Sequence, residues 1–125
     1  MRILLDTHIL LWWMFDDSRL KLHLRDQIVA RSNAIYFSSI SIAEIAIKIS
    51  LDKLFAPREM LLLFDEAGFT ELPVTARHSE ALIPLPWHHR DPFDRLLIAQ
   101  AQVENLALAT ADRALAAYEV ELLAN

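Results

Sequence analysis

Residues 1–7 read MRILLDT, and they decide how the chain is expected to fold. The three large apolar residues 3–5 are typical of a strand that is buried on both faces in a parallel sheet. Asp6 follows this strand directly, and the apolar stretch 9–15 indicates a helix after it. Asp6 therefore stands at a strand-to-helix junction, where open α/β sheets place their ligands. The alternative is that Asp6 and Thr7 only cap the helix.

The composition narrows the class of protein. A length of 125 residues predicts one domain, residues 1–125, with a single core. Hydrophobic residues make up 54% of the chain and the mean hydropathy is +0.26, which hints at apolar surface reserved for a partner. The net charge of -5 argues against a non-specific nucleic-acid binder that relies on Lys and Arg, although a bound metal could supply positive charge locally. The absence of cysteine excludes thiolate zinc sites, cysteine nucleophiles and disulfides.

The sequence predicts a cytoplasmic protein without a membrane segment. Asp6 interrupts the first apolar run too early for a signal peptide. No later stretch approaches the ~20 apolar residues that a membrane-spanning helix needs.

Strands and helices are expected to alternate along the chain. This order predicts a central, mostly parallel sheet of four to five strands that is covered by helices on both faces. Gly68 is expected to end one helix as its C-cap. Strands are expected at 3–5, 34–37, 69–72 and 106–109, with a final apolar stretch at 120–123, and helices at 9–15, 20–30, 41–51, 57–67, 76–83 and 95–105.

Four acids stand in equivalent places, each beside the carboxyl end of a strand or the start of a helix. They are Asp6, Glu44, Asp94 and Asp112. The carboxyl ends of parallel strands share one edge of a sheet, so these four side chains are expected to converge there.

Helix capping offers a simpler explanation for each acid taken singly. The pattern Ser41-x-x-Glu44 is a capping box. Asp91 is suited to be the N-cap of the helix that contains Asp94, with proline at the first helical position. Asp112 could cap a short final helix.

Convergence favours a metal site over capping. Two carboxylates ~4 Å apart repel by about 4 kcal/mol at the dielectric of a partly buried cleft, so either a cation or protons must be present. Oxygen ligands without cysteine suit Mg²⁺ or Mn²⁺. Such an ion activates water and neutralises charge on a phosphodiester, which indicates phosphoryl chemistry on a nucleic acid.

Four segments carry a family resemblance. They are LLDTH (4–8), SSISIAEIAIK (38–48), DPFDRLLIAQA (91–101) and LATADRAL (108–115). In order and spacing the chain resembles a PIN-domain ribonuclease of the VapC toxin type. The resemblance implies a three-layer α/β/α fold and Mg²⁺- or Mn²⁺-dependent endonuclease cleavage of RNA. It also implies a homodimer and a small antitoxin protein that blocks the site.

The resemblance carries over to single positions. It implies that Asp6, Glu44 and Asp112 are catalytic, metal-binding acids. For the remaining acid of the pattern Asp94 is the better match, and Asp91 is the alternative. Hydroxyl positions that would support the acids fall on Thr7 and Thr110.

Several neighbouring residues are left open by the sequence. His88 and His89 lie beside the expected site, where a catalytic or RNA-contacting role is open to them, although loop histidines are more often simply solvated. Three arginines could contact phosphates or pair with the acids; they are Arg90, Arg95 and Arg113. The apolar residues 12–13 and 60–64 exceed one helix face, which core packing or a partner-binding groove could explain.

Proteins of other classes share parts of the pattern. A receiver-type domain has this length and an acidic magnesium pocket, but it needs an acceptor Asp after a middle strand, where Ser38 and Ser39 stand here. A haloacid-dehalogenase-type phosphatase needs a second Asp where His8 stands. A non-catalytic α/β interaction module with the same acidic pocket is a further alternative.

Overall fold

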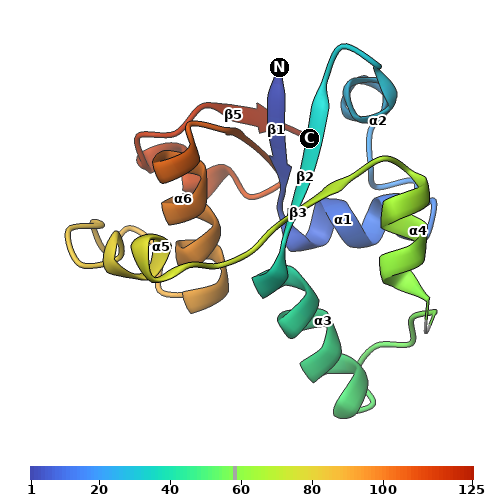
Figure 1. The fold of residues 1–125 in the computed structure, drawn as a ribbon, viewed down its shortest axis with the longest axis horizontal. Coiled ribbons are helices and arrows are strands. Elements are labelled where there is room, and N and C mark those ends of the chain that lie inside the picture. The colour runs from blue at the N-terminus through green and yellow to red at the C-terminus, as the bar shows by residue number, and fades with distance from the viewer. Residues whose placement is uncertain (58) are drawn as a thin grey trace.

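A five-stranded sheet, parallel throughout, forms the centre of the computed structural model, which describes residues 1–57 and 59–125 (Figure 1). The strand order is β3-β2-β1-β4-β5. The elements in chain order are β1 (Arg2–Leu5), α1 (Thr7–Met14), α2 (Leu22–Val29), β2 (Ala34–Ser38), α3 (Ser39–Ser50), α4 (Met60–Glu66), β3 (Thr70–Leu72), α5 (Ala76–Glu80), α6 (Pro92–Glu104), β4 (Ala107–Thr110), the 3₁₀ helix η1 (Arg113–Ala117) and β5 (Leu122–Ala124).

The central position of β1 confirms the expectation drawn from its three apolar residues. Ile3, Leu4 and Leu5 are fully buried, and β1 pairs with β2 on one side and β4 on the other. Successive side chains of a strand point to opposite faces, so a run of apolar residues feeds two cores. Ile3 and Leu5 pack with α1, α2 and α4, whereas Leu4 packs with α6.

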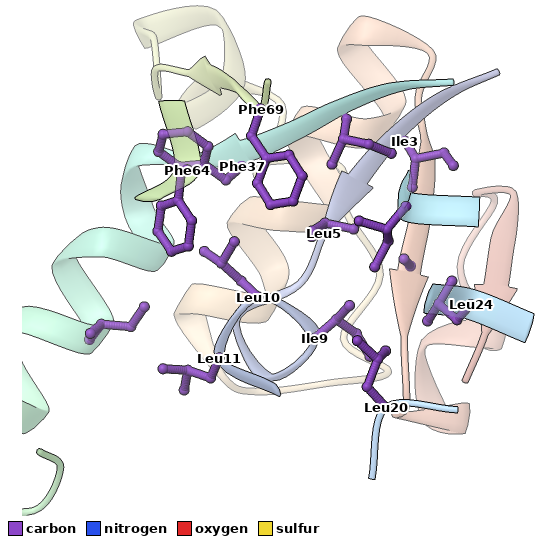
Figure 2. Close-up of a cluster of buried hydrophobic side chains, with 14 residues drawn as sticks. Ile3, Leu5, Ile9, Leu10, Leu11, Leu20, Leu24, Phe37, Phe64 and Phe69 are labelled. Carbon is purple, nitrogen blue, oxygen red and sulfur yellow. The ribbon is translucent and has the colours of Figure 1, made fainter. Parts of the chain in front are cut away.

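The two cores lie on opposite faces of the sheet. In Figure 2, Phe64 of α4 and Phe69 lie beside Phe37 of β2 at one end of the first core, and Leu24 of α2 lies at the other end. The second core is built around Leu97 of α6 and includes β4 and η1. The predicted α/β/α layering is therefore confirmed. The strand order also differs from the 2-1-3-4-5 order of receiver-type domains, which argues against that alternative.

The predicted capping box is wrong. Helix α3 begins at Ser39, and Ser38 is its N-cap, with the Ser38 side chain accepting from the Ile40 N–H. Ser41 and Glu44 consequently lie inside the helix, where neither can cap it. Strand β2 runs one residue further than expected and places the cap earlier, because Ser38 both ends the strand and starts the helix.

Helix α4 is shorter than predicted at its start. It begins at Met60, so Pro57 lies before it, and residue 58 lies outside the described residues. Its end is confirmed: Gly68 has φ 82°, a left-handed conformation that favours glycine. The Gly68 N–H donates to Asp65 O and the Phe69 N–H to Phe64 O, both at 2.9 Å, which forms a Schellman motif.

Other boundaries shift by a few residues. The helix expected at 20–30 is shorter at both ends and spans Leu22–Val29. The helix expected at 76–83 ends earlier and spans Ala76–Glu80. The last strand, expected at 120–123, lies at Leu122–Ala124. Within the two described ranges, no helix has the length and apolar character to cross a bilayer.

Three helices begin at the carboxyl edge of the sheet. In Figure 1, α1 and α3 start where β1 and β2 end, and α6 runs back along the sheet with its first turn at this same edge. Strand β4 ends there as well, just before η1. The chain thereby brings the starts of these elements to one side of the molecule.

Candidate metal centre

Asp6 links β1 to α1 and is buried, with 5% of its surface exposed. Its Oδ1 accepts from the Ile9 N–H at 2.9 Å, so Asp6 does cap the helix. Burial raises the pKa of Asp6, although hydrogen bonds from Thr110 and from the Ile9 backbone oppose the rise and the charge of Asp112 adds to it. A carboxylate that is costly to ionise here is one that a cation would stabilise.

Glu44 lies in the second turn of α3 and is largely buried. Lys48, one turn further on, places Nζ 3.3 Å from Glu44 Oε2. Glu44 therefore has a basic partner on its own helix. Near Glu44, the Thr7 hydroxyl donates to Ser41 Oγ at 2.9 Å and fixes α1 against α3.

Asp94 lies in the first turn of α6. Asp91 is the N-cap of this helix, and its Oδ1 accepts from the backbone N–H groups of Phe93 and Asp94. Burial raises the pKa of Asp94 to about 6, and the charges of Asp91, Asp6 and Glu44 contribute while His89 opposes the rise. Acids from three other positions in the sequence thus add to the raised pKa of Asp94.

Asp112 follows β4 and caps η1, with Oδ1 accepting from the Ala114 N–H at 3.0 Å. Its own backbone N–H donates to Thr110 Oγ1 at 3.0 Å. Both threonines that the sequence singled out make contacts at the carboxyl edge of the sheet. Thr110 contacts Asp6 and Asp112, and Thr7 contacts Ser41.

His89, whose role the sequence left open, is part of this centre. Its Nε2 lies 3.2 Å from Asp112 Oδ2 and 3.4 Å from Asp94 Oδ2. In the described part of the chain, ligand atoms of His89, Asp94 and Asp112 all lie within 4.8 Å of one another. Asp6 and Glu44 lie outside this closest group, but their charges act on Asp94. The only sequence signal was the position of His89 two residues before a helix cap.

The donor set fits a hard divalent cation. Carboxylate oxygens of Asp94 and Asp112 lie close together, and burial, with added repulsion from neighbouring acids, raises the pKa of Asp94. Mg²⁺ and Mn²⁺ bind through a few carboxylates and retain water for a substrate. Capping does not preclude metal binding, because a carboxylate oxygen that accepts one N–H bond keeps a second lone pair.

Arg95 has a role that neither sequence interpretation foresaw. It is 4% exposed, and its guanidinium donates to the carbonyls of Leu85 and Pro86 and lies 3.7 Å from the Trp87 ring centroid. Both expected roles, a phosphate contact and an ion pair with the acids, are therefore wrong for Arg95. Arg90 and Arg113 are exposed and remain candidates for phosphate contacts.

Residues 3–121 match the family model of the PIN domain. Because the match covers nearly the whole chain, the protein belongs to the PIN-domain family. A search of curated proteins finds no match.

Chains from solved toxin–antitoxin complexes share the fold. VapBC2 from Rickettsia felis, bound to a DNA fragment from its promoter, gives a TM-score of 0.75 at 18% identity, over 99% of this chain and 98% of that one. DNA-bound VapBC from Salmonella typhimurium gives 0.71 at 15% identity, over 99% and 98%. VapBC-1 from nontypeable Haemophilus influenzae gives 0.69 at 16% identity, over 99% and 98%. At these identities the similarity establishes the fold.

Proposed function

We propose that the protein is a metal-dependent endoribonuclease and the toxin of a toxin–antitoxin pair. The observation that carries the proposal is geometric: Asp94 and Asp112, from separate elements, place carboxylate oxygens within 4.8 Å of one another beside His89. Burial raises the pKa of Asp94 and of Asp6, and the charges of neighbouring acids add to both shifts. Acids so placed favour a divalent cation, and membership of the PIN-domain family supports nuclease chemistry.

The residues would divide the work by position. Asp94 and Asp112 would supply the oxygens closest to the ion, Asp6 would add negative charge from a buried position, and Glu44 would face the site from α3. When bound, Mg²⁺ or Mn²⁺ would activate water and neutralise charge on the phosphodiester. Thr110 would hold Asp6 and Asp112 in place through its hydroxyl group.

An RNA substrate is the second part of the proposal. Exposed Arg90 and Arg113 flank the acids and could contact phosphates on either side of the cleaved bond. Single-stranded or loop RNA is favoured, because its bases and backbone are accessible to a protein edge. An enzyme of this kind would act in the cytoplasm.

The partner is proposed to be a small antitoxin protein. Solved structures with the same fold are VapBC assemblies, two of them bound to DNA. The acidic edge and the net charge of -5 would attract an antitoxin Arg or Lys towards Asp94 and Asp112. Such a residue would compete with the cation and suppress activity.

RNA cleavage by the purified chain tests the proposal. A structured RNA should be cut at few positions in Mg²⁺ or Mn²⁺, left intact in EDTA, and cut again when metal is restored. Asp6→Asn and Asp94→Asn should each lower the rate by roughly a hundredfold or more, because each removes a charge from the site. Asp26→Asn, an exposed acid on α2, is the matched control and should cut like the parent.

Two results would contradict the proposal. Cleavage that persists in EDTA would remove the metal from the reaction. Equal cleavage by the parent and Asp94→Asn would show that the activity comes from a contaminant or from another site.

A further inference from the structure

The His89 side chain stands between two of the acids, with Nε2 3.2 Å from Asp112 Oδ2 and 3.4 Å from Asp94 Oδ2. Two roles are compatible with these distances. A deprotonated Nε2 could bind the metal beside the carboxylates, or a protonated Nε2 could donate to them. The two roles differ in where the ring carries its proton.

The other ring nitrogen decides between these roles. The backbone N–H of Asp91 donates to His89 Nδ1 at 3.1 Å. A proton on Nδ1 would face this N–H, so Nδ1 must be the acceptor and the neutral ring must carry its proton on Nε2. Nε2–H then faces Asp112 Oδ2, with Asp94 Oδ2 3.4 Å from the same nitrogen, and a nitrogen that carries a proton cannot bind a metal.

Tyr118 and Arg95 hold the backbone of the loop that carries His89. The His89 N–H donates to the Tyr118 hydroxyl at 2.8 Å, and that hydroxyl donates to Pro86 O at 2.9 Å. Buried Arg95 donates to Pro86 O at 2.8 Å, to His89 O at 3.3 Å and to the Tyr118 hydroxyl at 3.3 Å, with its guanidinium against Trp87. The backbone of His89 is therefore held at both its N–H and its carbonyl.

We propose that His89 is a positioning residue: its Nε2–H donates to Asp112 and lies against Asp94, and it holds these two carboxylates in the geometry that a divalent ion needs. The inference rests on the proposed function, because it concerns the same metal site. An N–H donor between two acids offsets part of their repulsion without occupying the cation's place. It also explains why Arg95 and Tyr118 fix a loop beside the site.

A donor role for His89 has a consequence for the choice of metal. If His89 only donates, the protein ligands of the ion are all oxygens, a set that suits Mg²⁺ and Mn²⁺. If His89 were a ligand, its nitrogen would favour ions such as Zn²⁺. Loss of the His89 donor should therefore weaken Mn²⁺ and Zn²⁺ binding by similar factors.

Calorimetric titration with Mn²⁺ tests the role of His89 without measuring activity. His89→Gln keeps an N–H donor near the place of Nε2 and should bind within about threefold of the parent. His89→Phe keeps a ring without a donor and should bind roughly 10- to 100-fold more weakly, the usual cost of removing a residue that orients metal ligands. His88→Phe is the matched control: His88 is exposed, packs edge-on against Tyr118, and should leave the affinity unchanged.

Three results would overturn the inference. Parent-like Mn²⁺ binding by His89→Phe would show that the donor is not needed. Equal losses in His89→Gln and His89→Phe, or a loss confined to Zn²⁺, would indicate that His89 binds the metal. A ¹⁵N-histidine NMR spectrum of the metal-free parent above neutral pH should show the proton on Nε2, and a proton on Nδ1 would refute the donor role.

Failure of the inference is distinct from failure of the proposed function. If the parent itself binds no Mn²⁺, the metal site is wrong, while the NMR spectrum still decides whether His89 is a donor. If the parent binds Mn²⁺, loses it in Asp94→Asn and keeps it in His89→Phe, the proposed function stands and the role of His89 is wrong.

Discussion

Burial and the charges of neighbouring acids raise the pKa of Asp94. Its pKa of about 6 lies above the ordinary 3.8 of an aspartate, so between about pH 4 and pH 6 the folded protein binds more protons than the unfolded chain. Stability from this group is therefore present at low pH and is lost as the pH rises through 6. A shift of this size corresponds to about 3 kcal/mol as an upper limit, which solvent screening of the partly exposed carboxyl group lowers.

The Asp94→Asn variant isolates this effect. In EDTA, the free energy of unfolding of the variant relative to the parent should increase between about pH 4 and pH 7, because only the parent has to ionise this partly buried carboxyl group. Urea denaturation of both proteins at several pH values measures the difference. A difference that does not change with pH would contradict the raised pKa.

Single residues differ in how far the sequence could place them. Asp6 and Asp112 follow buried apolar strands closely, so their position at the carboxyl edge followed from the local pattern. His89 and Arg95 depend on the path of the loop 85–91 across η1, and no local pattern describes that path. A loop histidine and a helix arginine look the same in sequence whether they are solvated or buried.

At the scale of elements, one side-chain contact fixes α1 against α3. The Thr7 hydroxyl donates to Ser41 Oγ in a buried place. Thr7→Ala and Ser41→Ala should each destabilise the protein by about 1 kcal/mol, and their double variant should cost less than the sum by a similar amount, because both remove one hydrogen bond.

Thr7 and Ser38 form the control pair for this double-mutant cycle. Ser38 caps α3 through its own bond to Ile40, so Ser38→Ala should cost about 1 kcal/mol and add to Thr7→Ala. Additivity of Thr7→Ala with Ser41→Ala would show that the contact contributes nothing to stability. Chemical denaturation of the single and double variants gives both coupling energies.

The left-handed glycine at the end of α4 leads to a second prediction about stability. Gly68 has φ 82°, and apart from Gly68 and its two chain neighbours, no atom of the described residues lies within 4 Å of the place where a Cβ would stand. Gly68→Ala should therefore cost about 1–2 kcal/mol through backbone strain alone. Gly68→Asn should cost less, because asparagine tolerates this conformation. Equal melting temperatures for Gly68→Ala and the parent would contradict the Schellman end.

The elements show where sequence patterns suffice and where they do not. Gly68 and Asp91 were placed correctly, because a left-handed C-cap and an Asp-Pro helix start each depend on local chemistry. The Ser41–Glu44 capping box was wrong, because several serines lie close together here and the end of β2, set by pairing with β1 and β3, selects Ser38. The pairing of β2 with β1 and β3 therefore selected one of several serines as the helix cap.

At the scale of the whole molecule, the apolar content divides between core and surface. Trp12 and Trp13 pack against the first core, so core packing explains the apolar residues at 12–13. Within the range 60–64, Phe64 is buried, whereas Leu61 and Leu62 are half exposed. Phe55, in the segment before α4, is 93% exposed. These exposed apolar side chains agree with the homodimer that the family resemblance implies, since exposed apolar residues are common at interfaces.

Light scattering tests the homodimer. The purified chain should have twice the monomer mass at tens of micromolar, and Leu62→Lys should shift it towards the monomer, because a charge would be buried at the interface. Leu22→Lys is the control, a leucine of α2 that is 74% exposed, and it should leave the mass unchanged. A monomeric parent at this concentration would refute the homodimer.

Titration of the metal-free protein with Mn²⁺, followed by calorimetry and by thermal melting, tests the central claim that acids from separate elements form one metal site. Asp6→Asn and Asp94→Asn should each weaken Mn²⁺ binding by roughly tenfold or more, yet melt no lower than the parent in EDTA, because each substitution relieves repulsion. The amide oxygen introduced by Asp6→Asn would also still accept the Ile9 N–H and keep the helix capped. Parent-like Mn²⁺ affinity combined with a large drop in melting temperature would show that the acids only cap helices.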